Sequence, residues 1–486
     1  MNEFVNDLNP RQIWKNFASL LNIPRPSKKE ERIIAFMKSF GENLGLETIV
    51  DETGNVIIKK PATPGKENVK GVILQGHLDM VPQKNSDKVH NFETDPIEAV
   101  LDGDWLKANG TTLGADNGMG VAAAMAILES TDIAHGPIEA LFTIDEETGM
   151  TGAFELKAGM LQGDILLNLD SEDEGELYVG CAGGTNANMK FSYSEEAVPE
   201  GWQAWQLVIK GLKGGHSGLD INLGRGNANK LMIRYLKHAI AKHKLKLASF
   251  EGGSLRNAIP REAFATIVAE AGKAEKLQEC VAEYFEIFRK ELSVTEPFLE
   301  FKILPAEMPA SVIDDSTTTR LIHAVYGCPN GVIRLSDSLA GLVETSTNLA
   351  IVKSNKGTIA VHCLLRSSVD SAKEDLEEMI SGIFELAGAT VVLDGKYPGW
   401  KPNPDSTILN VMSDTYNKHF GKVPEVKAIH AGLECGILGG NYPHWDMISF
   451  GPTMRFPHSP DERVNIPSVD KFYTFLTETL KNIPVK

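Results

Sequence analysis

The stretch GVILQGHLDM (residues 71–80) carries the pattern that decides the fold. In it a short apolar run, Val72 to Leu74, leads into His77 and Asp79. The same kind of junction recurs at Ile138–Ile144 before Asp145, Glu146 and Glu147, at Ile165–Leu169 before Asp170, and at Met447–Phe450 before His458. Such runs, alternating with helical segments, predict an α/β fold with a mostly parallel sheet. In these sheets the ligand crevice lies beyond the carboxyl ends of the strands, where these polar residues fall.

Helical segments separate the apolar runs. Ser27 and Glu30 have the spacing of a capping box, which predicts a helix that starts there and continues to Leu44. Further along, GTTLGADNGMGVAAAMAILES (residues 110–130) has the composition of a glycine-rich turn that opens a helix of small residues. The sequence therefore predicts a central sheet flanked by helices.

The middle of the chain, residues 186–393, lacks the junctions between apolar runs and acidic residues. It contains two stretches of predicted strands, each followed by an amphipathic helix. They are either a weak internal repeat or two unrelated α+β segments. We interpret this part as an inserted α+β domain, so that the first domain comprises residues 1–185 and 394–486.

The composition restricts the class of protein. The chain has 486 residues, enough for two or three domains, and its 48 basic and 65 acidic side chains give a net charge of −17. Nucleic acid and anionic membranes are therefore poor partners. The longest apolar run, Val121–Leu128, is too short to cross a membrane, and the first residues lack the features of a secretion signal. We expect a cytoplasmic protein.

Several common site classes are also excluded. The five cysteines are scattered and form no C-x-x-C pair, which argues against a disulfide framework and against a cysteine zinc site. The chain has no G-x-S-x-G elbow, no H-E-x-x-H motif and no phosphate-binding loop with its lysine.

Two histidines and several carboxylates follow the predicted strands. Taken singly, each has an ordinary explanation as a surface pair, a helix cap, an acidic turn or a loop histidine (His77 with Asp79, Asp116, Asp145–Glu147, Asp170 and His458). Taken together, these explanations require several unrelated coincidences at one rim of the sheet. Mixed histidine and carboxylate ligands suit zinc, manganese or cobalt, and one of the adjacent Glu146 and Glu147 could bind metal while the other serves as base. The pattern predicts metal-assisted hydrolysis.

Several long motifs resemble those of a known family. They are GHLDMVPQ, TTLGADNGMG, DEETGM, NLDSEDEGELYVGCAGG, GLKGGHSG, LRNAIPREAF, HAGLECGIL, and FGPTM followed by PHSPDER. In these motifs the chain resembles, from end to end, the bacterial aminoacyl-histidine dipeptidases, cytosolic members of the dinuclear-zinc aminoacylase and dipeptidase family. The resemblance implies a zinc-binding catalytic domain interrupted by a lid domain. It also implies two Zn²⁺ per chain, with Co²⁺ or Mn²⁺ as possible substitutes.

The resemblance further implies a role for each ligand of the two metals. One zinc would be bound by His77 and Asp170, the other by Glu147 and His458, and Asp116 would bridge the two.

Two neighbouring residues receive roles beside the metals. Asp79 would accept a hydrogen bond from His77 and so set its tautomer. Glu146 would be the general base for attack by a metal-bridging hydroxide. The peptide bond between Asp116 and Asn117 would be cis.

Four residues are predicted to contact the substrate. His216 resembles the lid histidine that stabilises the oxyanion, and Arg366 resembles the lid arginine that binds the substrate's free carboxylate. Asn257 is expected to make a polar contact and Gly432 a backbone contact. The ordinary alternatives are a water-exposed turn for His216, an ion pair with Asp370 for Arg366, and turn chemistry for Asn257 and Gly432.

The resulting hypothesis is a cytosolic dipeptidase that acts on small dipeptides, with the preference for Xaa-His resting on the resemblance alone. An N-acyl-amino-acid deacylase or a broad-specificity dipeptidase of the same family is the nearest alternative. A metal-stabilised binding protein is the non-enzymatic one, and it would leave Glu146 without a purpose. The oligomeric state is open, and a homodimer is one option.

Overall fold

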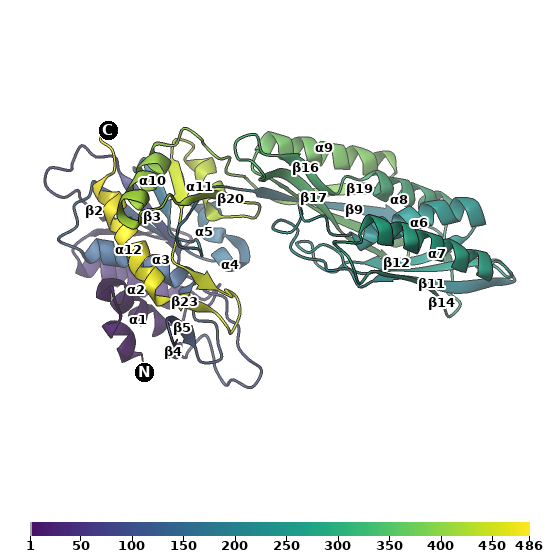
Figure 1. Ribbon diagram of the computed structural model, residues 1–486, viewed down its shortest axis with the longest axis horizontal. Helices are drawn as coiled ribbons and strands as arrows, with labels where there is room; N and C mark the ends of the chain where they lie inside the picture. Colours follow the sequence, from purple (N-terminus) through teal and green to yellow (C-terminus); the bar gives the residue numbers. More distant parts are fainter. Residues whose placement is uncertain (1) are drawn as a thin grey trace. The chain divides into compact units, whose positions relative to one another are not determined.

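Two units, each with its own β-sheet, make up the chain (Figure 1). The computed structural model describes residues 2–486. The first unit contains the residues up to Gly180, Pro402–Ala428 and Leu433–Lys486, and the second contains Cys181–Lys401 and Ile429–Gly432. The predicted boundaries, residues 186 and 393, fall inside strands β9 (Gly183–Ser192) and β19 (Thr390–Tyr397). Because these strands pair with each other within the second unit, the division lies outside both of them.

The main sheet of the first unit has eight strands in the order β1-β2-β6-β3-β7-β21-β8-β20. They are β1 (Glu47–Val50), β2 (Val56–Lys60), β6 (Ile138–Thr143), β3 (Val72–His77), β7 (Ile165–Asn168), β21 (Asp446–Ser449), β8 (Glu176–Cys181) and β20 (Glu425–Ile429). The four central strands, β6, β3, β7 and β21, are parallel, whereas β2 and β8 join them in antiparallel fashion. Every residue of β3, β6 and β7 is buried, as expected of parallel strands covered on both faces. The predicted α/β class is confirmed.

Helices flank this sheet. They are η1 (Glu3–Asp7), α1 (Arg11–Leu21), α2 (Glu31–Asn43), α3 (Ala115–Glu129), α4 (Glu146–Gly149), α5 (Thr151–Glu155), α10 (Thr407–Phe420), α11 (Glu434–Asn441) and α12 (Ile466–Lys481). The small side chains of α3 let it pack against both β3 and α1, and almost all of its residues are buried. A second sheet joins β22 (Met454–Arg455), β23 (Arg463–Asn465), β5 (Trp105–Ala108) and β4 (Ala99–Asp102).

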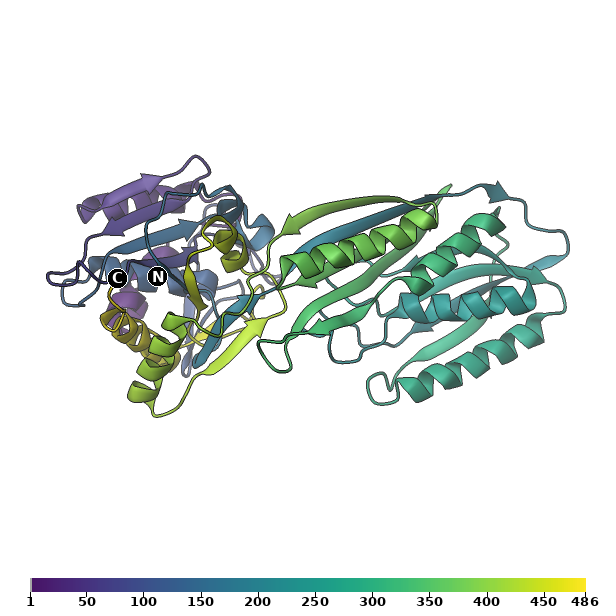
Figure 2. The same ribbon diagram turned by 90° about the horizontal axis from the view of Figure 1, so that it is seen from above.

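The second unit has one large sheet in the order β14-β11-β13-β12-β17-β18-β9-β19, with β16 (Gly331–Leu335) also paired to β17. The other strands are β14 (Glu300–Pro305), β11 (Trp202–Lys210), β13 (Ala263–Glu270), β12 (Lys246–Gly252), β17 (Val343–Asn355) and β18 (Thr358–Ser367); β10 (Glu195–Glu196) and β15 (Val312–Ile313) form a separate pair. Helices α6 (Ala228–His243), α7 (Ala274–Glu291), α8 (Asp315–Gly327) and α9 (Asp370–Leu386) cover one face of the large sheet (Figure 2).

The two halves of this sheet share one topology. One half runs β11-α6-β12-β13-α7-β14 and has the strand order β14-β11-β13-β12. In the other half, β9 is followed, after the first half, by α8, β17, β18, α9 and β19, with the equivalent order β19-β9-β18-β17. The halves meet where β12 pairs with β17. Of the two interpretations of this segment, the structure supports the internal repeat.

The cysteines and the helices bear on the predicted absence of disulfides and of membrane spans. All five cysteines are buried, and none forms a disulfide within residues 2–486. A search of the helices in the same range finds none with the length and apolar character needed to span a bilayer.

Candidate metal centre and substrate-binding residues

The five predicted metal ligands gather at the carboxyl end of the first unit's central strands. His77 is the last residue of β3, and Asp170 follows β7 by two residues. Asp116 stands at the start of α3, Glu147 lies in α4 after β6, and His458 lies between β22 and β23. Parallel strands end at one edge of a sheet, which is why residues so distant in sequence meet there.

Asp116 lies between two pairs of ligands. Its Oδ1 atom is 3.2 Å from His77 Nε2, which in turn is 3.5 Å from Asp170 Oδ1. Its Oδ2 atom is 3.3 Å from His458 Nε2, which is 2.8 Å from Glu147 Oε2. The two oxygens of one carboxylate therefore face two separate pairs, each made of a histidine and a carboxylate. The peptide bond after Asp116 is cis, which confirms that prediction.

The donors at this centre fit divalent cations. Asp170 Oδ1 and Glu147 Oε1 are buried and have no hydrogen-bond partner among residues 2–486. Burial raises the pKa of Asp170 to about 7 and also raises the pKa of Glu147, and the charge of Asp116 adds to both shifts. Crowded, buried carboxylates with unsatisfied oxygens are costly unless a cation pairs with them. Two imidazoles and three carboxylates form a donor set typical of zinc, cobalt or manganese.

Asp79 lies beside the ring of His77. Its Oδ1 atom is 3.2 Å from His77 Nδ1, and its carboxylate also accepts hydrogen bonds from Ser27 Oγ (2.8 Å) and from the backbone N–H groups of Glu146 (3.0 Å) and Glu147 (3.2 Å). Burial favours the neutral acid, but the bonds from His77, Ser27 and the backbone outweigh it and lower the pKa of Asp79 to about 2. An ionised Asp79 is compatible with its predicted role, in which it would accept the Nδ1 proton of His77 and leave Nε2 free to bind metal.

Glu146 lies next to the ligands but in a different electrostatic setting from Asp79. Burial, with the nearby carboxylates of Asp170, Glu434 and Glu147, raises the pKa of Glu146 well above its usual value, although His77 opposes the shift. One of its oxygens lies within 4.8 Å of ligand atoms of both His77 and Glu147. A carboxyl group in this position, with a raised pKa, is suited to take up a proton beside the predicted ligands.

Sequence reasoning missed the residues that hold the ligand-bearing loops. The predicted capping box is wrong: α2 begins at Glu31, and Ser27 donates to Asp79 instead. Glu30 accepts the N–H groups of Lys28 (2.8 Å) and Asp145 (3.2 Å). Both side chains therefore bind the loops next to the predicted ligands and do not cap the helix.

A buried carboxylate, Glu434, was missed as well. It is 1% exposed and accepts hydrogen bonds from Gln75 Nε2 (2.6 Å) and Thr143 Oγ1 (2.8 Å), and Asn168 donates to Gln75 (2.5 Å). Burial raises the pKa of Glu434 to about 7. The partners Gln75, Thr143 and Asn168 lie on β3, β6 and β7, a few positions before the predicted ligands. The apolar residues around Glu434 in GLECGIL were the available signal that it would be buried.

In the second unit, His216 has a defined tautomer. Its Nδ1 atom accepts the backbone N–H groups of Gly218 (3.2 Å) and Leu219 (3.0 Å), so the proton of the neutral ring lies on Nε2. Burial and the positive charge of Arg366 lower the pKa of His216, which favours this neutral form. The ring is half-buried and presents one N–H donor. This geometry suits the predicted contact with an oxyanion.

Arg366 is buried on β18 without a carboxylate partner. It is 6% exposed and donates to the hydroxyl groups of Tyr397 (3.2 Å) and Ser217 (3.5 Å). No carboxylate oxygen of residues 2–486 lies within 4.0 Å of its guanidinium, and Asp370 pairs with Lys373 instead. The alternative of an Arg366–Asp370 pair is therefore wrong. A buried guanidinium of this kind is ready for an anionic ligand.

The other two predicted contacts lie in the second unit. Asn257 is exposed, and its carbonyl accepts the N–H of Ser217 (2.8 Å), next to His216. Gly432 ends the short segment Ile429–Gly432. Their roles toward a substrate stay predictions.

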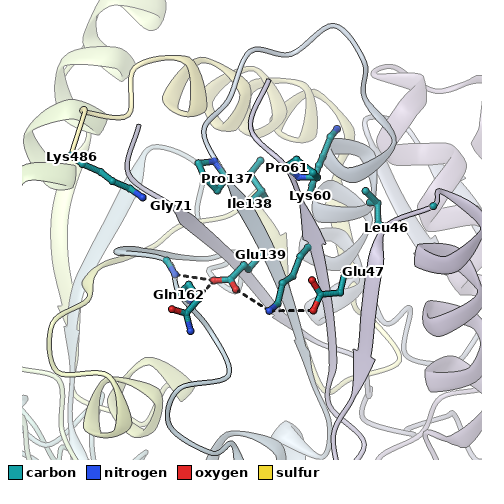
Figure 3. A pocket seen from close by; sticks show the side chains of 13 residues that line it. Leu46, Glu47, Lys60, Pro61, Gly71, Pro137, Ile138, Glu139, Gln162 and Lys486 are labelled. Carbon is teal, nitrogen blue, oxygen red and sulfur yellow. Dashed lines mark hydrogen bonds and ion pairs between the residues drawn. The ribbon is translucent and has the colours of Figure 1, made fainter. Parts of the chain in front are cut away.

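A cavity of about 440 Å³ lies at the other end of the parallel strands (Figure 3). It is bordered by Gly71 and Ile138, at the amino ends of β3 and β6, and contains none of the predicted site residues. Its buried Glu139 accepts the N–H groups of Gln162 (2.7 Å) and Gly163 (2.8 Å) and is 3.9 Å from Lys59. Lys59 also lies 3.5 Å from Glu47, and the cavity is at the end of the strands away from the predicted ligands, so we do not assign it to the catalytic site.

The chain is similar to known peptidases. The model of peptidase family M20/M25/M40 matches residues 73–482. The cytosol non-specific dipeptidase of Escherichia coli is 48% identical over 483 residues, which cover 99% of each chain. The crystal structure of aminoacylhistidine dipeptidase from Vibrio alginolyticus matches with a TM-score of 0.95 and 49% identity over 100% of both chains. A tripeptidase from Staphylococcus aureus, with a TM-score of 0.56, 16% identity and coverage of 98% and 99%, shares the fold alone.

Proposed function

We propose that this chain, which belongs to peptidase family M20/M25/M40, is a metallodipeptidase that binds two zinc ions at the carboxyl end of its central sheet. The observation that carries the proposal is the position of Asp116, whose two oxygens face two separate pairs of a histidine and a carboxylate. His77 and Asp170 would hold one ion, and Glu147 and His458 the other. Cobalt or manganese could replace zinc in this donor set.

When bound, the metals supply Lewis acidity, which activates a water for attack and polarises the peptide carbonyl. The protein's own part in the chemistry is the movement of a proton. Glu146 takes a proton from the attacking water and later delivers it to the departing amine, as the C–N bond breaks. Its position beside ligand atoms of His77 and Glu147 supports this role, and burial raises the pKa of its carboxyl group, which favours uptake of a proton.

The second unit would supply the groups that hold the substrate. His216 donates from Nε2–H to the oxygen that becomes negatively charged, and Arg366 binds the free carboxylate of the dipeptide. We propose that this unit acts as a lid, since its residues and the metal ligands must act on one substrate molecule. Asn257 and the backbone at Gly432 would complete the contacts.

The substrate class rests on the relatives. One relative is named a non-specific dipeptidase and the other an aminoacylhistidine dipeptidase, so we propose dipeptide hydrolysis that includes Xaa-His. The name of the first also places that protein in the cytosol, in line with the cytoplasmic location expected here.

The test of this function is turnover by a sample whose metal content is known. We expect a chain with two zinc ions to cleave Ala-His and other dipeptides, to lose activity on chelation, and to regain it when zinc is restored. A two-zinc sample that cleaves no dipeptide would contradict the proposal. Faster cleavage of N-acyl amino acids than of free dipeptides would instead support the deacylase alternative.

For His216→Ala we expect kcat to fall about a hundredfold with little change in KM, because an oxyanion donor acts mainly in the transition state and is typically worth about 3 kcal/mol. Bound metal should stay at the wild-type amount, since His216 belongs to the second unit and is not a predicted ligand. Steady-state kinetics and metal analysis of the same preparation check both statements. An unchanged kcat with a raised KM would show that His216 contacts only the bound substrate.

For Arg366 we expect a preference for substrates with a free carboxylate. A C-terminal amide or a tripeptide leaves the buried guanidinium without its anion, and a charge-assisted contact is worth about 1.5 to 3 kcal/mol. Wild-type enzyme should therefore cleave a dipeptide at least tenfold more efficiently than its amide. Arg366→Ala should lower the efficiency on the dipeptide and nearly abolish the difference.

The measurement for Arg366 is a double-mutant cycle of four kcat/KM values. Arg234→Ala is a matched control, because it removes an arginine of the same unit that is already paired with Glu291 (2.6 Å). If the preference for the free carboxylate survives in Arg366→Ala, the carboxylate is bound elsewhere.

A further inference from the structure

We propose that Glu462 is a positioning residue that holds Asp116 where it can serve two metals. This inference rests on the proposed function in one respect, the role of Asp116 as the shared ligand. Glu462 is not a metal ligand in that scheme, and it touches neither substrate nor reacting atoms. It acts on the backbone that carries Asp116.

The carboxylate of Glu462 accepts four successive backbone N–H groups. Oε2 accepts from Leu113 (2.7 Å) and Gly114 (3.0 Å), and Oε1 accepts from Ala115 (2.8 Å) and Asp116 (3.1 Å). Glu462 is 2% exposed, so these bonds form away from water. Buried N–H groups without a partner are costly, and all four of these groups have Glu462 as their partner. The loop before α3 is thus held by one distant side chain.

The sequence at the start of α3 explains why a distant residue is needed. Its N-cap is Gly114, which has a left-handed backbone (φ 72°) and no side chain to bond the first N–H groups. A side chain could not be added there, because a Cβ atom would lie 2.7 Å from Arg25 Nη2. Asp116 itself has non-helical dihedral angles (φ −81°, ψ 110°), so the helix does not set its orientation. Glu462 replaces the missing local cap.

The same loop is held from its other side by Arg25. This buried side chain donates to the carbonyl of Gly114 and to the carbonyls of Leu78 (2.9 Å) and Asp79 (3.0 Å). Arg25 therefore joins the loop of Asp116 to the loop that follows His77. Glu462 and Arg25 together fix the backbone on both sides of the first predicted metal position.

Glu462 also connects the shared ligand to a ligand of the second metal. It lies four residues after His458, and its own N–H donates to the carbonyl of Ser459 (2.9 Å). The turn from 458 to 462 thus supplies one predicted ligand, His458, and at the same time holds the backbone of another, Asp116. A change at Glu462 should alter the separation of these two ligands, and so weaken metal binding without removing any donor.

The experiment compares Glu462→Gln with Glu139→Gln in the full chain. Glutamine keeps the size of the side chain, but its NH₂ group would face two of the four N–H donors and cannot accept from them. Glu139 is the matched control: it is also buried and accepts two successive backbone N–H groups, but it lies at the opposite end of the strands (Figure 3). Zinc and cobalt affinities are measured by competition with a chelator, and the absorption spectrum of the cobalt-loaded protein is recorded.

We expect Glu462→Gln to bind metal 10- to 100-fold more weakly than wild type and to show an altered cobalt spectrum. Glu139→Gln should have wild-type affinity and spectrum, whatever its thermal stability. Wild-type metal affinity in a folded Glu462→Gln would overturn the inference, since the residue would then only cap the helix. If that variant does not fold, the same comparison is made with Glu462→Asp, which keeps both carboxylate oxygens on a shorter side chain.

These readouts separate this inference from the proposed function. Metal affinity and the cobalt spectrum are measured without substrate. A wild-type chain that binds two metals and cleaves no dipeptide would contradict the function and leave the role of Glu462 intact.

Discussion

Replacing Glu146 by glutamine is expected to lower kcat by a factor of about 10² to 10⁴ while both metal ions stay bound. Glutamine has nearly the same shape as glutamate but cannot take up a proton at neutral pH. The proposed proton transfer from water to the leaving amine would therefore lose its carrier. The large expected loss follows because the step that breaks the C–N bond depends on protonation of the nitrogen.

The neighbouring residue provides the matched control for this experiment. Glu147 Oε2 lies 2.8 Å from His458 Nε2, so Glu147→Gln should lose bound metal, whereas Glu146→Gln should keep it. Both variants are assayed for kcat and for metal per chain. Atoms of both glutamates lie within 4.8 Å of a ligand atom of His77, and only this pair of variants tells their roles apart. Metal loss in Glu146→Gln with retention in Glu147→Gln would exchange the two assignments.

The parallel core of the first unit could be predicted because its signal is local. Strands β3, β6 and β7 contain short apolar runs and are buried along their whole length. Strand β3 ends at His77, Glu146 and Glu147 follow β6, and Asp170 follows β7. Because the carboxyl ends of parallel strands lie at one edge of a sheet, these residues can be placed there before any of their side-chain contacts are known. The predicted ligands come together for this reason.

The supporting residues could not be predicted because their partners are remote in sequence. Glu462 stands in the polar run Asp461-Glu462-Arg463, which has the composition of a solvated turn, yet its carboxylate is buried against a loop that precedes it by 346 to 349 residues. Ser27 and Glu30 matched a local capping pattern, and tertiary hydrogen bonds with Asp79 and Asp145 overrode it. A local sequence pattern cannot show whether a side chain caps a nearby helix or binds a residue that comes close only in the folded chain.

The domain boundaries show the same limit. Acidic junctions mark the first unit and are absent from residues 186–393, which is why an inserted domain was predicted there. Strands β9 and β19, however, pair with each other at its two ends, and the sequence contains no signal for that long-range pairing. Contact between these strands extends the second unit to Cys181 and Lys401.

The variant Asp116→Ala is expected to lose both metals and at least a thousandfold in kcat/KM. Its two oxygens face separate pairs of ligands, so one substitution removes a donor from each of the two proposed ions. Each position would keep only a histidine and one other carboxylate, fewer protein donors than catalytic zinc usually has. Metal per chain, determined at several zinc concentrations, is the direct measurement, and kcat/KM on the same samples follows it.

Asp173→Ala controls for the loss of a negative charge near the centre, because Asp173 pairs with Arg455 at the surface (2.7 Å) and faces no predicted ligand. It should keep two metals and wild-type turnover. The pattern of metal loss in Asp116→Ala then decides between two arrangements. Loss of a single ion, with the other at wild-type affinity, would mean that Asp116 serves one position only and that the two ions do not share it. Full occupancy of both positions would contradict the shared role of Asp116, because removal of a ligand that binds two metals must weaken the binding of at least one of them.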